Sequence, residues 1–430
     1  MDDLLAARAL FGLSLAFHIV FAAIGVAMPL FMVLAEWRWR RNGSEVHLEL
    51  ARRWAKGTAI LFAVGAVSGT VISFELGLLW PRFMAFAGAI IGMPFSLEGF
   101  AFFAEAIFLG IYLYGWERVS PGLHLASGVV VAVSGALSAF FVTLANAWMN
   151  RPAGFQLAAG VATGIRPFEA MFPPGWAHEV IHVLLSCYVA TGFAVAGVHA
   201  WRLLRDPRSR VHRAALGIAL GVGSVAALLM PISGDFSARQ VAAEQPVKLA
   251  ALEGQFKTER GAPLRIGGVP DVERGETRFA LEIPRGLSVL AFHDPGAEVR
   301  GLEAFPRETW PNVRNVHLAF QVMVGLGTLL AALAALWIVL RLRRREPPPW
   351  LLRLVVLAAP GGFLALEAGW LVTEWGRQPY SVWGVLRTAD SVTPVGHLAA
   401  PLVLFTLLYL FLAVVVIVLL RRQGTAGGGK

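Results

Sequence analysis

The chain contains little cysteine and little charge. Its 430 residues include a single cysteine, Cys187, which excludes an internal disulfide, a cysteine-ligated cluster and a cysteine-based zinc site. Charged residues make up only 15% of the sequence, whereas 57% of it is hydrophobic and the mean hydropathy is +0.63. Soluble domains carry about 25% charged residues, so this composition indicates an integral membrane protein.

Long apolar runs define the fold class. A helix of about 20 apolar residues crosses the roughly 30 Å of hydrocarbon in a bilayer. The runs are continuous and do not alternate with polar residues, which favours helices over membrane strands. We therefore predict an all-α integral membrane protein with about nine transmembrane helices, at residues 11–34, 57–79, 95–115, 124–148, 178–201, 214–234, 314–340, 351–373 and 397–420.

The basic residues indicate how the chain is oriented. They gather after every odd-numbered helix, at residues 38–56, 118, 202–213, 341–345 and 421–422. Because basic loops stay in the cytoplasm, we predict an outer N-terminus and a cytoplasmic tail at residues 421–430. This topology and contact with anionic lipid explain the net charge of +9 without nucleic acid. The first apolar run is long and follows an acidic start, so we expect a retained helix rather than a cleaved signal.

One polar segment interrupts the apolar runs. We divide the chain into helices 1 to 6 (1–234), an outer loop (235–313), helices 7 to 9 (314–420) and the tail. Loops of this length tend to be functional or disordered. Within the loop, residues 245–257 have apolar residues at helical spacing around Lys248 and Glu253, which predicts a short amphipathic helix at the membrane surface. A solvated connector is the alternative.

Five side chains that could bind a metal or a proton lie in separate apolar runs: His18, Glu98, His182, Met323 and Glu374. Ionisable groups inside a membrane are costly and usually functional. With the N-terminus outside, all five fall toward the outer side. Histidine and methionine are axial ligands of low-spin haem. The residue types alone leave three alternatives open: a haem protein of this kind, a cytochrome with paired histidines, and a proton-coupled transporter.

Several separated motifs, spread over nearly the whole chain, resemble those of subunit I of the cytochrome bd quinol oxidases. They comprise Phe17-His18, residues 97–105, 146–152, 248–253, 323–327 and 369–379, and His182 with Tyr188. Each alone is weak, but together and in this order they are specific. The resemblance implies the catalytic subunit of a quinol:O₂ oxidoreductase in the bacterial cytoplasmic (inner) membrane. The alternative is a haem b electron-transfer paralogue that does not reduce O₂.

The resemblance also implies a set of iron ligands. His182 and Met323 would bind a low-spin haem b. His18 and Glu374 would bind two high-spin haems, one a haem b and the other a haem d, and which residue holds which haem stays open. Glu98 would stand at the high-spin site, on the far side of the iron held by His18.

Other residues would serve the haems and the quinol. Arg377 and Gln378 would neutralise haem propionates, with a turn held by side-chain hydrogen bonds as the alternative. The segment with Lys248 and Glu253 resembles the quinol-binding loop in its short form. Here Glu253 would accept a proton from the quinol and Lys248 would hydrogen-bond a quinol oxygen. The sequence does not decide between ubiquinol and menaquinol.

A proton route and partners complete the predictions. Glu98 and Glu105 are seven residues apart, so they share one helix face at a separation of about 10 Å and could pass protons from the cytoplasm, with Ser138 continuing the relay. Ala106 stands where some relatives carry serine, and Gln321 where some carry arginine; a cyanide-insensitive variant could share such departures. The family works as a heterodimer with subunit II, sometimes with a single-helix accessory subunit.

Overall fold

Nine segments of the described chain are long and apolar enough to cross a membrane. The computed structural model describes residues 2–425, with side chains up to residue 423. The spanning helices are α1 (Asp3–Asn42), α2 (Glu45–Leu79), α3 (Pro81–Tyr114), α4 (Pro121–Asn150), α6 (Trp176–Arg205), α7 (Arg210–Glu244), α10 (Val313–Leu342), the pair α11 (Pro349–Ala358) and α12 (Gly361–Arg377), and α13 (Ala399–Thr425). This confirms the predicted all-α membrane class. Of the predicted tail, residues 426–430 lie outside the described residues.

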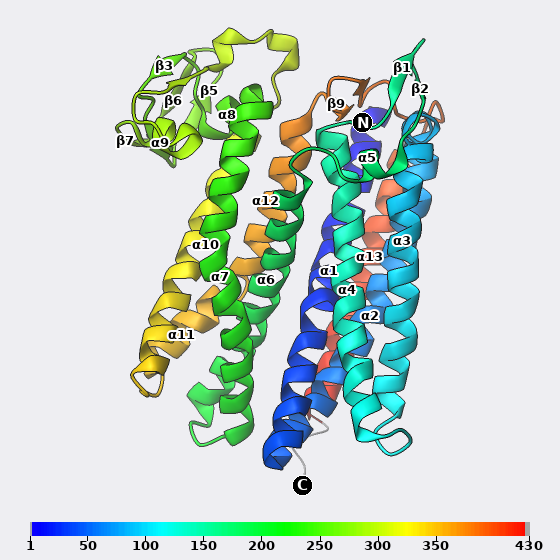
Figure 1. Ribbon diagram of the computed structural model, residues 1–430, viewed down its shortest axis with the longest axis vertical. Coiled ribbons are helices and arrows are strands. Elements are labelled where there is room, and N and C mark those ends of the chain that lie inside the picture. The colour runs from blue at the N-terminus through cyan, green and yellow to red at the C-terminus, as the bar shows by residue number, and fades with distance from the viewer. Residues whose placement is uncertain (1, 426–430) are drawn as a thin grey trace.

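The helices form two groups that lie side by side (Figure 1). One group holds α1 to α4 with α13, and the other holds α6, α7 and α10 to α12. Helix α6 joins them, because it packs against α1 and α4 as well as α7, α11 and α12. The main apolar core runs across this junction and includes Phe31 of α1, Phe193 of α6 and Leu330 of α10. In a bilayer each helix satisfies its own backbone hydrogen bonds, so long apolar helices are the stable solution for these runs.

Several helices are longer than the apolar runs predicted. Helix α3 begins at Pro81 instead of residue 95, and α7 continues to Glu244 instead of residue 234. Hydropathy detects only the part of a helix that sits in hydrocarbon, whereas the helix itself ends where capping and packing end it. The predicted eighth helix is broken in two at Pro360, which has no N–H to donate and crowds the preceding turn.

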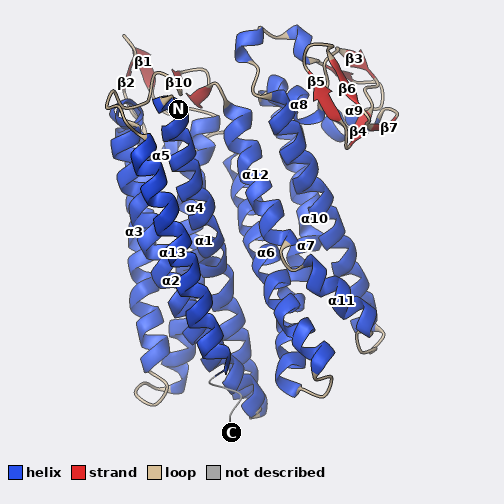
Figure 2. Cartoon of the chain, turned by 180° about the vertical axis from the view of Figure 1, so that it is seen from behind, coloured by secondary structure: helices blue, strands red, loops and turns tan. Residues whose placement is uncertain are grey.

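The two ends of the molecule differ in character. We call the end that carries residues 151–175, 245–312 and 378–398 the loop end, and the end that carries the turns 43–44, 115–120, 206–209 and 343–348 the arginine end. Short strands occur only at the loop end in Figure 2, where the N-terminus also lies. The smaller elements there are β1 (Gln156–Ala158), β2 (Val161–Thr163), α5 (Pro167–Met171), β9 (Tyr380–Val382) and β10 (Leu386–Arg387).

The long polar loop is a compact structure that begins at Gln245, after the end of α7. Its strands pair as three nested antiparallel ladders, β3 with β8, β4 with β7 and β5 with β6. The elements are α8 (Pro246–Glu253), β3 (Glu259–Arg260), β4 (Leu264–Ile266), β5 (Val269–Asp271), β6 (Glu276–Arg278), β7 (Leu281–Ile283), α9 (Gly286–Phe292), β8 (Glu298–Val299), and the 3-10 turns Leu302–Ala304 and Arg307–Thr309.

The short helix predicted around Lys248 is present as α8, but it does not lie on a surface. Every residue from Val247 to Glu253 is buried. The helix packs against α7, α10 and α12, and the 3-10 turn at Leu302–Ala304 covers it. The amphipathic surface helix of the sequence analysis is therefore wrong in its setting, because the folded loop encloses α8 and its two charged side chains.

Candidate functional site

His18 of α1 is held in one orientation by α2. Its Nδ1 lies 3.0 Å from the Oγ of Ser68, and that hydroxyl donates to the backbone oxygen of Val64 at 3.0 Å. Because the hydroxyl proton is used there, Ser68 accepts the Nδ1–H of His18, which leaves Nε2 with a free lone pair. The Cε1 side of the ring lies against Gly69, where an added Cβ would be 3.0 Å from the histidine Cε1. This arrangement suits a metal-binding imidazole.

His182 and Met323 lie on α6 and α10, two helices of the second group that share the neighbours α7 and α12. The Nδ1 of His182 lies 3.1 Å from the Oγ of Ser233 on α7. Met323 of α10 rests its sulfur on Gly369 of α12, 3.0 Å from the position of an added Cβ. Helices α6 and α10 both pack against α7 and α12, and both side chains are only half-buried. Neither side chain is therefore fully enclosed by protein atoms.

Glu374, near the end of α12, has both carboxylate oxygens engaged. Asn146 of α4 donates to Oε1 at 2.7 Å, and Arg377 donates to Oε2. The side chain of Gln378 donates to the backbone oxygen of Glu374 at 3.4 Å. These contacts match the turn that the sequence analysis kept as the alternative for Arg377 and Gln378. Arg377 nevertheless is only 2% exposed, and its Nε and Nη1 have no partner among the described residues, so it keeps donors for an anionic group such as a propionate.

The two glutamates of α3 both face α4. Ser138 donates to Glu98 Oε1 at 2.9 Å. Glu105 is buried, and its carboxylate lies 3.4 Å from the Cβ position of Gly135 on α4 and 3.8 Å from that of Gly25 on α1. Ser138 therefore contacts Glu98 directly, whereas Glu105 lies between Gly135 and Gly25. The two glutamates lie on the same face of α3. This agrees with the shared helix face that the seven-residue spacing predicts.

The predicted ligands lie at different depths. At 1.5 Å per residue, Glu374 is about 5 Å from the loop end of its own helix, but Glu98 is about 25 Å from the start of α3. The apolar run that begins at residue 95 predicts Glu98 early in its helix. Residues before that run are also helical, so Glu98 lies at mid-helix, and His18 lies almost as far, about 22 Å, from the start of α1.

Lys248 and Glu253 share α8 but point in different directions, since five residues turn a helix by about 140° from one to the other. The Lys248 stem lies on Gly376 of α12, with its Cε 2.8 Å from the position of an added Cβ. Burial lowers the pKa of Lys248 to about 8, with Glu179 as the main opposing charge. Burial raises the pKa of Glu253 to about 8, against the opposing charge of Arg265.

Some buried polar residues had no role in the sequence analysis. Arg151 binds Glu179 at 2.6 Å, Glu244 at 3.0 Å and His178 at 3.0 Å, which ties α4 to α6 and α7 at the loop end. Other examples are Glu75, which accepts from Ser14 at 2.8 Å; Glu36 with His124; and His317, whose ring nitrogens face the backbone oxygens of Leu252 and Gly267. A single polar residue in an apolar run gives no spacing signal, so the sequence marks these only by their polarity.

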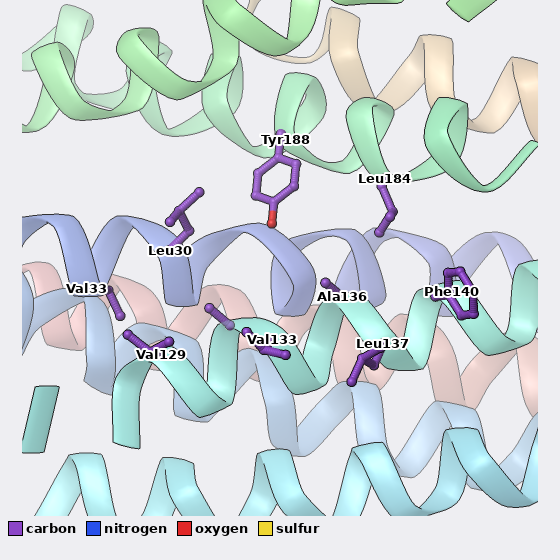
Figure 3. Close-up of a pocket in the computed structure, with 10 residues that line it drawn as sticks. Leu30, Val33, Val129, Val133, Ala136, Leu137, Phe140, Leu184 and Tyr188 are labelled. Carbon is purple, nitrogen blue, oxygen red and sulfur yellow. The ribbon is translucent and has the colours of Figure 1, made fainter. Parts of the chain in front are cut away.

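An apolar hollow of about 360 Å³ lies between α1, α4 and α6 (Figure 3). It is lined by aliphatic and aromatic side chains, and in the close-up the hydroxyl of Tyr188 points into it. None of the predicted ligands lines this hollow. It is therefore separate from the residues predicted to bind haem and quinol.

Comparison with known proteins identifies the family. The sequence model for cytochrome bd terminal oxidase subunit I matches residues 6–428. The chain belongs to this family. It is 38% identical to the putative cytochrome bd menaquinol oxidase subunit I of Bacillus subtilis (strain 168) over 98% of this chain and 96% of that protein. It is 31% identical to the cytochrome bd ubiquinol oxidase subunit 1 of the same organism, over 98% of this chain and 94% of that protein.

A solved structure gives the same result for the fold. The bd oxidase from Geobacillus thermodenitrificans superimposes with a TM-score of 0.93 at 40% sequence identity, covering 99% of each chain. The resemblance stated from the motifs is therefore confirmed, and with it a multi-pass protein of the bacterial inner membrane. Membership of the bd oxidase family also implies haem cofactors and a second subunit.

Proposed function

We propose that this subunit I, paired with subunit II, oxidises quinol at the loop end and reduces O₂ to water. As a member of the cytochrome bd family, the chain is the catalytic subunit of a quinol oxidase. The main observation behind the proposal is that the family match covers residues 6–428, which include every residue given a role below. When bound, the haems supply electron transfer and the reduction of O₂.

Four side chains are proposed as iron ligands. His182 and Met323 hold the low-spin haem b, and His18 and Glu374 hold the two high-spin haems, one haem b and one haem d. The hydrogen bond from His18 to Ser68 supports this role, because it leaves Nε2 as the free nitrogen. Glu98 would belong to the high-spin site, and Arg377 could bind a propionate through Nε and Nη1, which have no partner among the described residues. The donor set fits haem, since imidazole, thioether and carboxylate all ligate iron.

The loop end is proposed to bind the quinol beside α8. Glu253 accepts a quinol proton, and Lys248 donates a hydrogen bond to a quinol oxygen. Two observations support this assignment: both side chains are buried in an otherwise apolar helix, and Glu253 Oε2 has no partner among the described residues. Gln321 supports the loop, since it accepts from the backbone of Gly267 at 2.9 Å and donates to that of Arg265 at 3.0 Å.

The proposed orientation has the loop end outside and the arginine end in the cytoplasm. The basic residues in and beside the short turns of the arginine end, at 38–56, 118, 202–213 and 341–345, support it, because positive charge near short loops keeps those loops in the cytoplasm. Protons for water formation then move along α3 from the cytoplasm, by way of Glu105 and then Glu98 with Ser138. Quinol protons leave on the outer side, so turnover generates a membrane potential without a pump.

A spectrum and an oxygen electrode test this function. The purified heterodimer should show a low-spin haem b, a high-spin haem b and a haem d in its reduced-minus-oxidised spectrum, and it should consume O₂ with a quinol donor. Haem b signals without O₂ consumption would instead indicate the electron-transfer paralogue. Absence of haem would overturn both. Oxidase activity in liposomes that produced no potential would contradict the proposed orientation and proton route.

A further inference from the structure

A buried polar cluster at the arginine end has no part in the function proposed so far. It consists of Glu36 of α1, Tyr112 of α3 and His124 of α4, none more than 1% exposed. Groups of this kind are costly in an apolar bundle and are usually functional there. Their positions relative to Glu105 suggest what they do.

The hydrogen bonds of His124 favour its protonated form. Nδ1 lies 2.9 Å from Glu36 Oε1, and Nε2 lies 3.0 Å from the backbone oxygen of Tyr112. Both neighbours are acceptors, and a neutral imidazole carries a proton on only one nitrogen. An imidazolium satisfies both contacts, whereas a neutral ring would set one lone pair against an oxygen. His124 therefore is built to hold a proton beside a carboxylate.

Glu36 connects this proton to the surface. Its Oε1 also accepts from Arg40, whose Nη2 lies at 2.6 Å and which is partly exposed. Its Oε2 is buried and has no hydrogen-bond donor among the described residues. A buried carboxylate oxygen in a native protein is normally hydrogen-bonded. Oε2 is therefore open to a further donor, such as a water molecule on the way from the solvent.

The cluster continues the line of the two glutamates on α3. Glu98, Glu105 and Tyr112 follow one another at seven-residue intervals, so they lie on one face with steps of about 10 Å. Helix α4 lines this face with Ser138 against Glu98, Gly135 against Glu105 and Gly128 against the Tyr112 ring, followed by His124.

Helix α1 forms the third wall of the same path. Gly25 faces Glu105, the backbone oxygen of Met32 accepts from the Tyr112 hydroxyl at 3.4 Å, and Glu36 accepts from His124. The interface of α1, α3 and α4 thus holds polar groups from Glu98 to the arginine end.

The remaining neighbours of His124 are aromatic or positively charged. The ring lies between Tyr112 and Trp116, with centroids 4.6 Å and 4.1 Å away. The guanidinium of Arg52, from α2, lies over the Trp116 ring, 5.0 Å from its centroid. Arg40 of α1 pairs with Glu36. Glu36 is therefore the anion in contact with this imidazole. The charges around the cluster allow a proton to be released from His124 and replaced.

We propose that His124 and Glu36 are the proton-loading pair of the oxidase, at the arginine end of the path that leads past Tyr112 to Glu105. His124 releases its proton into the path, and Glu36 passes a proton from the solvent back to the imidazole. No electron moves, and each proton released is replaced by one taken up. This proposal rests on the proposed function, because only consumption of protons at the haem site drives the transfer.

The test compares His124→Gln and Glu36→Gln with wild type in the intact heterodimer. Proton supply is needed for O₂ reduction but not for the first transfer of electrons from quinol. We expect steady-state O₂ consumption to fall at least tenfold, while the haem spectra and the rate of anaerobic haem reduction by quinol stay unchanged. Glu36→Asp should recover part of the lost activity. His199→Gln is the matched control, because His199 lies at the same end and pairs with His212 at 3.0 Å, away from α3.

The outcomes separate this proposal from the proposed function. A wild-type enzyme without haem or quinol oxidase activity would defeat the function. An active wild type with normal turnover in His124→Gln and Glu36→Gln would defeat only the proton-loading pair. If His124→Gln lost its haem, normal turnover in Glu36→Gln and Tyr112→Phe would also overturn the pair. Equal losses in the His199→Gln control would show a structural effect, and the pair would again be rejected.

Discussion

The strongest quantitative prediction concerns Glu253. Burial raises its pKa from an ordinary 4.5 to about 8, so ionising it in the folded protein costs about 5 kcal/mol more than in water. Only about one molecule in ten then has an ionised Glu253 at pH 7. A base must be ionised to accept a proton. We therefore expect kcat/KM for quinol to rise about tenfold for each pH unit up to about 8 and then level off.

Lys248 should add a second limb to this profile. Its pKa is lowered to about 8 by burial, so its charge is lost above that pH. If the charged amine holds the quinol oxygen, kcat/KM falls again at high pH and the profile is bell-shaped. Lys248→Arg keeps the charge and should remove the fall while leaving the rise.

The assay is O₂ consumption at low quinol concentration between pH 5.5 and 9. Glu253→Gln should lose the rise and lower kcat/KM by about a hundredfold or more above pH 8, in the range of general-base effects. Glu273→Gln, an exposed glutamate of the same loop, should behave as wild type. A wild-type profile that is flat from pH 6 to 8, or a rise that survives in Glu253→Gln, would refute the reasoning.

The same group should affect stability. The folded state binds the proton of Glu253 up to about pH 8, whereas the unfolded chain releases it near 4.5. Stability contributed by this group is therefore present below about pH 4.5 and is lost as the pH rises through about 8. Thermal unfolding should show a smaller loss over this window in Glu253→Gln than in wild type. An equal loss in both would contradict the buried environment of the carboxyl.

Three substitutions test the haem ligands by absorption spectroscopy. His182→Ala should remove the low-spin signal alone, and a retained low-spin spectrum would show that another residue binds that iron. Gly69→Ala sets a Cβ 3.0 Å from His18 Cε1, so the ring must shift by a few tenths of an ångström and the high-spin spectrum should change; Gly77→Ala, with nothing within 4 Å, should leave it unchanged. Glu374→Ala should disturb the high-spin pair, and an intact pair would remove Glu374 from the ligand set.

The sequence could predict the spanning helices because each is driven by the same strong term, the exclusion of apolar residues from water. It could not predict where helices extend beyond the hydrocarbon. Helix α7 carries Arg239 and Glu244 in its last turns, which hydropathy reads as loop, although Glu244 pairs with Arg151 and Arg239 with Asp235. Of these two pairs, only Glu244 with Arg151 joins residues distant in the sequence, and a local pattern cannot reveal such a partner.

The candidate site, too, could be predicted only in part from the sequence. The motifs located His18, His182, Met323 and Glu374, and one of them begins at Asn146, but none predicted that Asn146 or Ser68 contacts a ligand. Neither Ser68 beside His18 nor Asn146 beside Glu374 carries a periodic signal, since each matters only through a contact between helices. The burial of α8 was missed for a related reason, because the loop that encloses it has no apolar run.

One packing feature is shared by five of the groups to which roles are proposed: each of the five lies on a glycine of a neighbouring element. The pairs are His18 on Gly69, Met323 on Gly369, Glu105 on Gly135, Tyr112 on Gly128 and Lys248 on Gly376. Small residues in membrane helices usually let two backbones approach, as Gly192 and Gly223 do between α6 and α7, where an added Cβ at Gly192 would lie 2.7 Å from the facing Cα.

At four of the five functional contacts the space left by the missing Cβ is filled by the side chain of a neighbouring element, and at Gly135 the Glu105 carboxylate shares that space with the backbone oxygen of Gly25. Both kinds of glycine contact bring helices together, but a substitution of the glycine has a different effect in each kind. A Cβ at Gly192 must push two backbones apart and so weakens the whole bundle, whereas a Cβ at Gly69 meets only an imidazole that can tilt. We therefore expect a substitution at one of these five glycines to change the orientation of the side chain that rests on it more than the stability of the fold. Single substitutions of this kind can then test the function of a side chain without unfolding the bundle.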